Sequence, residues 1–326
     1  MKTGIFCTFA ALLLCFSANA QTTDISSPDG RIVLTVDNGS DLNYSISFDG
    51  ETIIGKSSLG FEFVGEEPMK GGFVLTERPS VRIMTEEWTP VVKNKHAKVR
   101  SVWNEATFKL QESGDLRRKM DLEVKVFDGG AAFRYHLYDD HRLVTREISQ
   151  EMTGFRLPDG AHAWVADYEG HVTSQEKEFF KTAVSSIKPE TVAGLPLLVE
   201  AGPQKWLAVT EAHIDNYPGF FLGAEDGCLQ TMLSPIPGYE DVKARFDDEI
   251  TTPWRVVLIG DDPGQFIESE IIRTLNPPCA IEDTEWIQPG LCAWDHWWSG
   301  EVKMEMDVIK EYIDLASAQG WPYMLI

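Results

Sequence analysis

Most of this chain follows the pattern of β-strands separated by short turns. From Ile25 to about Gly260, apolar and polar residues alternate in short segments, as they do in strands with one buried face. Turn sequences such as Asp49-Gly50 and Asp128-Gly129-Gly130 divide these segments. Because strands joined by short turns pair antiparallel, this pattern restricts the region to packed antiparallel sheets.

The predicted strands are too numerous for a simple sandwich of the immunoglobulin type, so a large two-sheet sandwich is the expected architecture. Two acidic runs, 65–71 and 239–249, interrupt the pattern and are predicted to be long surface loops. The predicted strands cover residues 31–36, 42–48, 52–54, 96–111, 119–127, 131–138, 144–157, 162–168, 195–200, 206–211, 219–222, 229–233 and 254–259.

The pattern changes at Asp262, where helical spacing first appears. Pro263 suits the first turn of a helix, which Asn276-Pro277-Pro278 ends. Further on, residues 291–294 predict a short strand, 302–316 an amphipathic helix capped by Gly320, and 321–326 a second strand. The two helix predictions rest on apolar residues at helical spacing. These are Phe266, Ile267, Ile271, Ile272 and Leu275 in the first helix, and Val302, Met306, Ile309, Ile313 and Ala316 in the second.

Strand, helix and strand in this order form a βαβ unit, which implies a parallel sheet. Two parallel strands alone leave open edges and an uncovered helix face. We therefore expect the sequence to be the front portion of a longer protein and to stop inside its second domain.

The first twenty residues have the organisation of a secretory signal peptide. Lys2 provides the positive start, residues 5–16 are apolar but too few to span a bilayer, and Ala18-Asn19-Ala20 is a small-x-small cleavage site. The protein is therefore expected to be exported, with the periplasm as its compartment. The formal net charge of −22 argues against a nucleic acid partner, and no later segment predicts membrane insertion.

Three cysteines remain after the predicted cleavage site. Cys228, Cys279 and Cys292 lack the spacing of a zinc or thioredoxin motif. Pairing of Cys279 with Cys292 stays open, and buried free thiols are the interpretation favoured for all three.

The segment Pro289–Gly300 concentrates aromatic and ionisable residues at the end of the predicted 291–294 strand. Ligands of α/β folds bind at the carboxyl ends of strands, so this segment is a candidate binding site. Its residues of interest are Trp294, Asp295, His296, Trp297 and Trp298.

Several motifs of this chain resemble those of glycoside hydrolase family 97, whose members are α-glucosidases and α-galactosidases known mainly from glycan-degrading Bacteroidetes. The motifs are Asp283-Thr284-x-Trp286-Ile287-x-Pro289-Gly290, Trp294-Asp295-x-Trp297-Trp298, and Thr210-Glu211-Ala212 followed by Tyr217. The resemblance covers essentially the whole mature chain. After the signal peptide at 1–20, it implies an N-terminal β-supersandwich over 21–275 and the truncated start of a catalytic (β/α)8 TIM barrel over 276–326.

The resemblance also implies an exo-acting, Ca²⁺-dependent enzyme that cleaves terminal α-linked galactose or glucose from oligosaccharides. In the family, a glutamate of the sandwich helps to bind the calcium ion, and Glu211 matches it by position. The catalytic carboxylates belong to later barrel strands, downstream of Ile326, so this fragment alone is expected to be inactive. The run Trp-Asp-His-Trp-Trp-Ser favours the α-galactoside branch.

Each candidate residue also has a purely structural interpretation. Trp294, Trp297 and Trp298 are candidates for stacking on a pyranose, but tryptophans also pack in cores and between domains. Asp295 is a candidate for binding sugar hydroxyls, or it caps the following helix. Glu211 suits calcium as a hard oxygen ligand, whereas a strand-end glutamate is more often solvated.

A different class of function remains open beside the enzyme. The chain fits a non-catalytic carbohydrate-binding or mutarotase-like β-sandwich module, and also an inactive truncated gene product. The sequence has no GxSxG motif, no P-loop and no paired histidines of zinc type, so nothing supports an esterase, an NTPase or a zinc enzyme.

Overall fold

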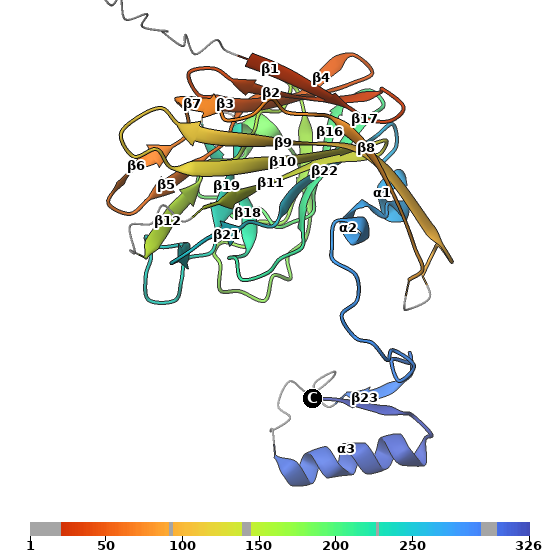
Figure 1. Cartoon of the computed structure of the whole chain (residues 1–326). Helices are drawn as coiled ribbons and strands as arrows, with labels where there is room; N and C mark the ends of the chain where they lie inside the picture. Colours follow the sequence, from red (N-terminus) through yellow and green to blue (C-terminus); the bar gives the residue numbers. More distant parts are fainter. Residues whose placement is uncertain (1–20, 91–93, 139–144, 226–227, 295–304) are drawn as a thin grey trace, which may run out of the picture. The chain divides into compact units, whose positions relative to one another are not determined.

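The computed structural model describes residues 21–90, 94–138, 145–225, 228–294 and 305–326. The chain divides into two compact units (Figure 1). The first contains Met1–Trp88 and Val99–Pro277, and the second contains Thr89–Lys98 and Pro278–Ile326. Each unit is considered separately below.

The largest sheet of the first unit has eleven strands, and every pairing within it is antiparallel. Its main path runs β15-β14-β16-β17-β22-β11-β10-β9-β7, while β21 pairs with β11 and β8 pairs with β9. The strands are β7 (Phe73–Leu75), β8 (Arg82–Trp88), β9 (Val99–Glu112), β10 (Lys119–Phe127), β11 (Gly130–Leu137), β14 (His162–Val165), β15 (Phe180–Ala183), β16 (Leu197–Gly202), β17 (Lys205–Ala212), β21 (Ile250–Thr251) and β22 (Trp254–Gly260). The short 3₁₀ helix Val184–Ser186 follows β15.

Three smaller antiparallel sheets complete the described part of the unit, so the prediction of packed antiparallel sheets is confirmed. The expected two-sheet arrangement is wrong, because the strands divide among four sheets. The first has the order β1-β2-β3-β4, from β1 (Gln21–Ser26), β2 (Ile32–Asn38), β3 (Leu42–Phe48) and β4 (Glu51–Ser58). The second has the order β20-β12-β5-β6, from β5 (Phe61–Phe63), β6 (Glu66–Met69), β12 (Arg146–Glu151) and β20 (Ala244–Phe246). The third has the order β13-β19-β18, from β13 (Gly154–Phe155), β18 (Phe220–Glu225) and β19 (Cys228–Leu233).

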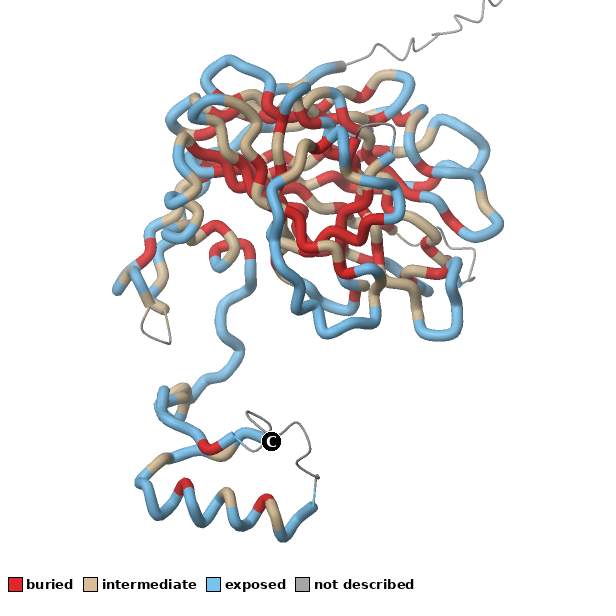
Figure 2. Tube along the Cα trace, turned by 180° about the vertical axis from the view of Figure 1, so that it is seen from behind, coloured by how far each residue is buried: buried red, intermediate tan, exposed pale blue. Residues whose placement is uncertain are grey.

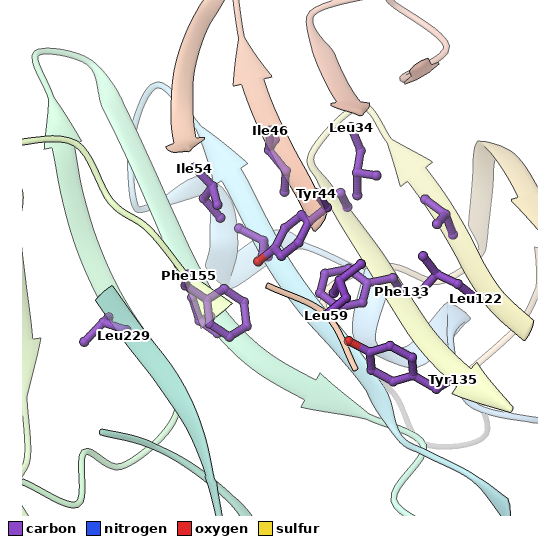
Figure 3. Packing of buried hydrophobic residues seen from close by; sticks show 14 of the residues in the cluster. Leu34, Tyr44, Ile46, Ile54, Leu59, Leu122, Phe133, Tyr135, Phe155 and Leu229 are labelled. Atoms are coloured by element: carbon purple, nitrogen blue, oxygen red, sulfur yellow. The ribbon is translucent and has the colours of Figure 1, made fainter. Parts of the chain in front are cut away.

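The core lies between the inward faces of these sheets. Strands β2 and β3 alternate buried and half-buried residues along their whole length, as the sequence pattern predicts. The buried side chains form one continuous cluster to which all four sheets contribute (Figures 2 and 3). Tyr44 packs on Phe133 with ring centroids 4.8 Å apart, and its hydroxyl donates to the Gly154 carbonyl oxygen at 2.8 Å.

The helix predicted after Asp262 forms as two separate turns, so that prediction is wrong in detail. They are α1 (Gln265–Glu268) and α2 (Ile271–Thr274). Ser269 between them is extended, with φ −64° and ψ 133°, and breaks the helical hydrogen-bond series. The break lets Ile271 and Leu275 join a second buried cluster on the outer face of the large sheet, with Trp103 and Trp254, while Ile267 stays 69% exposed.

The two acidic runs predicted as surface loops contain short strands instead. Residues 66–69 form β6, which pairs with β5 and buries Met69 completely. Arg118, itself buried, donates to the carbonyl oxygens of Glu67 and Pro68 and to the Glu112 carboxylate. Arg118, which is distant in the sequence, thus orders residues 66–69. The composition of residues 65–71 alone gives no sign of this order. In the second run, residues 244–246 form β20.

The second unit contains the predicted βαβ arrangement. Strand β23 (Cys292–Trp294) pairs in parallel with β24 (Tyr323–Leu325), and α3 (Met306–Ala318) connects them. Gly320 adopts a φ of +68°, and the Trp321 N–H donates to the Ala316 carbonyl oxygen at 2.8 Å, which confirms the predicted glycine cap. Ile309 and Ala316 of the predicted apolar face are buried, whereas Met306 and Ile313 are exposed, and Val302 lies outside the described residues.

All three mature cysteines are free thiols in the structure. Cys228 is buried as predicted, but Cys279 and Cys292 are exposed, so the prediction of burial is wrong for these two. Cys279 lies in an extended linker, and Cys292 begins a strand with little packed against it. In the described part of the chain, no helix has both the length and the apolar character needed to cross a membrane. The expected signal peptide lies outside the described residues.

Candidate functional site

Glu211 occupies the end of a central strand of the large sheet. It is the last residue but one of β17 and lies directly opposite Arg255 of β22. The alternation along β17 turns its side chain toward the same face as Leu207 and Val209, which are fully buried. Its side chain is 12% exposed, so the solvated strand-end interpretation of Glu211 is wrong.

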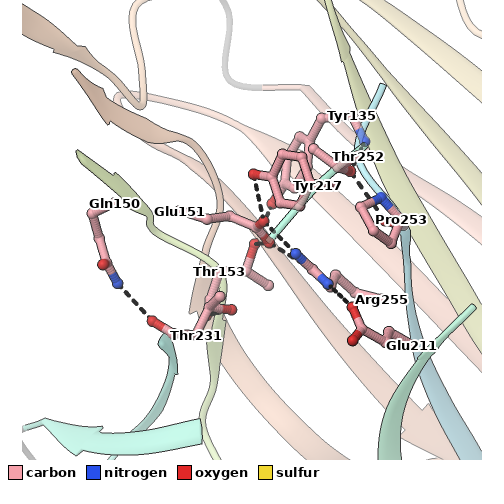
Figure 4. Close-up of polar contacts among 10 residues, drawn as sticks. All are labelled: Tyr135, Gln150, Glu151, Thr153, Glu211, Tyr217, Thr231, Thr252, Pro253 and Arg255. Carbon is pink, nitrogen blue, oxygen red and sulfur yellow. Dashed lines mark hydrogen bonds and ion pairs between the residues drawn. The ribbon is translucent and has the colours of Figure 1, made fainter. Parts of the chain in front are cut away.

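Arg255 links Glu211 to a second glutamate through one planar guanidinium group (Figure 4). Its Nη1 donates to Glu211 Oε2 at 2.7 Å. Its Nε and Nη2 donate to Glu151 Oε1 at 2.9 Å and Oε2 at 2.6 Å. Arg255 and Glu151 are both completely buried. This bidentate pairing fixes the plane of the guanidinium, and with it the direction of the third bond.

Further hydrogen bonds fix Glu151 in turn. The Thr153 hydroxyl donates to Oε1 at 2.9 Å, and the Tyr217 hydroxyl donates to Oε2 at 3.1 Å. Because the Thr153 hydrogen is used in this way, Tyr135 is the donor in the 2.7 Å bond between the Tyr135 and Thr153 hydroxyls. Each carboxylate oxygen of Glu151 therefore accepts two hydrogen bonds, and the group is satisfied as an anion.

The three charged groups carry an excess negative charge in a buried setting. Two carboxylates face one guanidinium, so the group has a net charge of −1 when all three are ionised. Burial raises the pKa of Glu211 above its ordinary value, against the opposing effects of Arg255 and the Phe220 N–H. Burial alone would lower the pKa of Arg255, but Glu151 and Glu211 reverse this and the pKa is raised. A cation beside Glu211 would compensate the remaining charge.

Glu211 fits a calcium site as one ligand among several. Calcium takes six to eight oxygen ligands, and carboxylates are its usual protein donors. Across residues 21–90, 94–138, 145–225, 228–294 and 305–326, no three His, Cys, Asp or Glu side chains are grouped as metal ligands. The donor chemistry of Glu211 agrees with the expectation, and the described residues do not complete a carboxylate cage around it.

The loop that follows β17 forms two open cavities at this end of the sandwich. One, of about 260 Å³, is lined by His213, Asp215 and Asn216 together with residues 249–252. The other, of about 440 Å³, is lined by residues 216–218, 234–237 and 243–245. Glu211 is not among the residues that line either cavity, whereas the loop after its strand contributes to both.

The other predicted site residues belong to the second unit or lie outside the described residues. Trp294 is the last residue of β23 in the second unit, and its side chain is 39% exposed. Asp295, Trp297 and Trp298 lie outside the described residues. Glu200, which lies near Glu211 in the sequence, forms an ion pair with Lys181 at 2.6 Å and has no part in the Arg255 network.

Three members of the network were missed in the sequence. Arg255 had a visible signal, because it is the one charged residue in the otherwise apolar run Trp254–Gly260. Tyr217 was visible only as part of the family motif that follows Glu211, with no role assigned to it. Glu151 had no signal, since it lies in a segment of mixed polarity.

Comparisons with known proteins were made for the whole chain. Residues 25–278 match the family model described as "Glycosyl-hydrolase 97 N-terminal". A retaining alpha-galactosidase of Bacteroides thetaiotaomicron is 26% identical over 97% of this chain and 52% of its own length. A probable retaining alpha-galactosidase of Streptomyces bingchenggensis is 28% identical over 92% of this chain and 45% of its own length.

Solved structures give the same picture. A variant of a glycoside hydrolase family 97 enzyme from Pseudoalteromonas sp. strain K8 superposes with a TM-score of 0.81 at 26% identity, over 93% of this chain and 46% of that one. Structures of this Pseudoalteromonas enzyme also exist in complex with panose and with acarbose. The chain therefore spans about half the length of the relatives that it matches.

Proposed function

Because this chain belongs to glycoside hydrolase family 97, we propose that the protein containing it is an exo-acting α-glycosidase. It removes terminal α-linked galactose or glucose from oligosaccharides. The observation that carries the proposal beyond family membership is the buried Glu151–Arg255–Glu211 network, in which two carboxylates face one guanidinium group and Glu211 stands at the end of a central strand.

In this proposal Glu211 is the sandwich ligand of a calcium ion. Its carboxylate is a hard donor, its side chain keeps 12% exposure at the strand end, and the net charge of −1 around it favours a cation. When bound, calcium supplies Lewis-acid charge close to the sugar oxygens. Arg255 and the Phe220 N–H hold the Glu211 side chain at the strand end.

We assign the second unit to the start of the catalytic barrel. The parallel pair β23–β24 with α3 between its strands is the repeating unit of a (β/α)8 barrel. Trp294, Asp295, Trp297 and Trp298 then line the wall of the sugar pocket at the end of the first barrel strand. The catalytic carboxylates belong to the part of the relatives that this chain does not span.

Galactose is the favoured sugar, and retention of configuration the favoured outcome. The two curated relatives are named as retaining or probable retaining α-galactosidases, which supports both points. The panose and acarbose complexes of the Pseudoalteromonas enzyme support an oligosaccharide as the substrate. The N-terminal signal sequence supports export to the periplasm, where such oligosaccharides would be met.

The test is hydrolysis by the intact protein of nitrophenyl α-galactoside and α-glucoside, with nitrophenyl β-galactoside as the stereochemical control. We expect turnover of the α-linked substrates, fastest for α-galactoside, with loss on chelation by EDTA and recovery on addition of Ca²⁺. Binding of galactose without turnover of any of these substrates would contradict the enzyme and favour the non-catalytic carbohydrate-binding module.

A further inference from the structure

We propose that Arg255 and Glu151 are positioning residues that hold Glu211 ready for calcium and keep its charge available to the ion. This inference rests on the proposed role of Glu211 as a calcium ligand. Neither residue is within the strand segment that carries Glu211, since Arg255 belongs to β22 and Glu151 to β12.

The direction of the Glu211 side chain is set by Arg255. A glutamate side chain has three rotatable bonds, and at a strand end it has few neighbours to restrict them. The 2.7 Å bond from Arg255 Nη1 to Oε2 anchors the carboxylate at one oxygen. Arg255 itself is held by both oxygens of Glu151, and its guanidinium lies 4.3 Å from the Phe220 ring centroid. The anchor is therefore rigid.

Glu151 offsets the positive charge of Arg255. An arginine paired with Glu211 alone would neutralise it, and the pair would repel a cation at close range. Glu151 satisfies Arg255 from the buried side, so the group of three keeps one negative charge. Glu211 is the least buried of the three side chains and is therefore the carboxylate of the group nearest to solvent. The network thus gives the two carboxylates different roles: Glu151 holds Arg255, and Glu211 is the proposed calcium ligand.

A matched pair elsewhere in the unit separates this role from general structural support. Arg118 is also buried and forms a bidentate ion pair with Glu112, with hydrogen bonds of 2.7 Å from Nε and 2.6 Å from Nη2. Glu112 is 12% exposed, the same as Glu211. The Arg118 pair orders the β6 segment and contacts none of the residues of the Arg255 network. Glu112→Gln is therefore the control for Glu151→Gln.

The experiment measures calcium affinity by titration calorimetry on the intact, metal-free protein. Glu151→Gln should raise the dissociation constant by about 10- to 100-fold, the usual effect of losing a partner that orients a metal ligand. Tyr217→Phe, which removes one hydrogen bond to Glu151 without changing any charge, should raise it by a smaller factor. Glu112→Gln should lower the thermal unfolding temperature but leave calcium affinity unchanged.

Glu211→Gln serves as the reference that separates the two hypotheses. If Glu211→Gln binds calcium as the wild type does, the proposed calcium role of Glu211 fails. If Glu211→Gln loses affinity while Glu151→Gln and Tyr217→Phe keep wild-type affinity, the positioning role fails alone. If Glu151→Gln does not fold, Tyr217→Phe decides, and wild-type affinity in it overturns the inference. A loss of affinity in Glu112→Gln equal to that in Glu151→Gln would also overturn it.

Discussion

Buried cationic side chains of this protein contact strands that are distant in the sequence. Arg118 and Arg255 are each neutralised by a bidentate carboxylate, and removing one partner of such a pair typically costs about 3–5 kcal/mol. Lys125 on the outer face of the large sheet is different. Its ammonium lies 4.8 Å from the Trp103 ring centroid and 5.0 Å from that of Trp254, and burial lowers its pKa. Keeping Lys125 charged in the folded protein therefore lowers the free energy of unfolding.

This cost predicts a pH dependence of stability. Between the lowered pKa of folded Lys125 and its ordinary value of 10.5, the unfolded chain binds more protons, so the free energy of unfolding rises as the pH rises through this window. Lys125→Met keeps the packing of the stem and removes the charge. We expect it to be more stable than the wild type at pH 7, with a difference that shrinks as the pH approaches 10.5.

Urea unfolding at several pH values measures that difference. Lys109→Met is the control. The hydrogen bond that Lys109 donates to Glu77 raises the pKa of Lys109, so the stabilisation from this pair is retained up to pH 10.5 and lost only above it. A stability difference between Lys125→Met and the wild type that stays constant from pH 7 to 10.5 would contradict the account of Lys125.

At the scale of elements, the predicted strands are accurate where alternation and a tight turn coincide. The predicted strands 42–48 and 119–127 match β3 and β10 residue for residue. Strand β8 was missed because none of its side chains is buried, which leaves no alternation to detect. The alternation and the turn are both local features of the sequence. Alternation appears only where one face of a strand packs on the core.

The candidate site was less predictable, because it depends on an irregularity. Glu151 is three positions after Ile148, so regular alternation would place the two on opposite faces of β12. A shift of register between Ile148 and Gln150 turns both side chains into the core. Glu211 could be identified by its resemblance to a family motif, but its partners come from strands about 40 and 60 residues away in the sequence.

Close backbone contacts between elements give a direct test of the fold. Gly71 bridges to Asp41, and a β-carbon there would collide with the Ser40 carbonyl oxygen and approach the Asp41 Cα. Gly71→Ala should therefore destabilise the protein by about 1–3 kcal/mol, because the backbone must shift. At Gly114 a β-carbon meets no atom within 4 Å, so Gly114→Ala should change stability by less than about 0.5 kcal/mol.

Urea unfolding of the two alanine variants makes the comparison. Equal stability of Gly71→Ala and Gly114→Ala would show that the contact between residues 71 and 40–41 is not as close as the structure has it.

At the scale of the whole molecule, each of the two units carries its own proposed functional residues. The sandwich contributes a rigid, charged strand end, and the βαβ unit contributes the aromatic segment after β23. The family match covers 25–278, and the chain spans about half the length of its relatives. We propose that the sandwich takes part in the chemistry through Glu211 rather than serving only as a support.

Calcium titration calorimetry on the intact protein tests directly whether Glu211 binds the calcium ion. Glu211→Gln should abolish detectable binding or raise the dissociation constant by more than about tenfold, since loss of an orienting partner alone has an effect of that order. Glu200→Gln, a change at a glutamate paired with Lys181, should bind calcium as the wild type does. Unchanged calcium binding in Glu211→Gln would contradict the account.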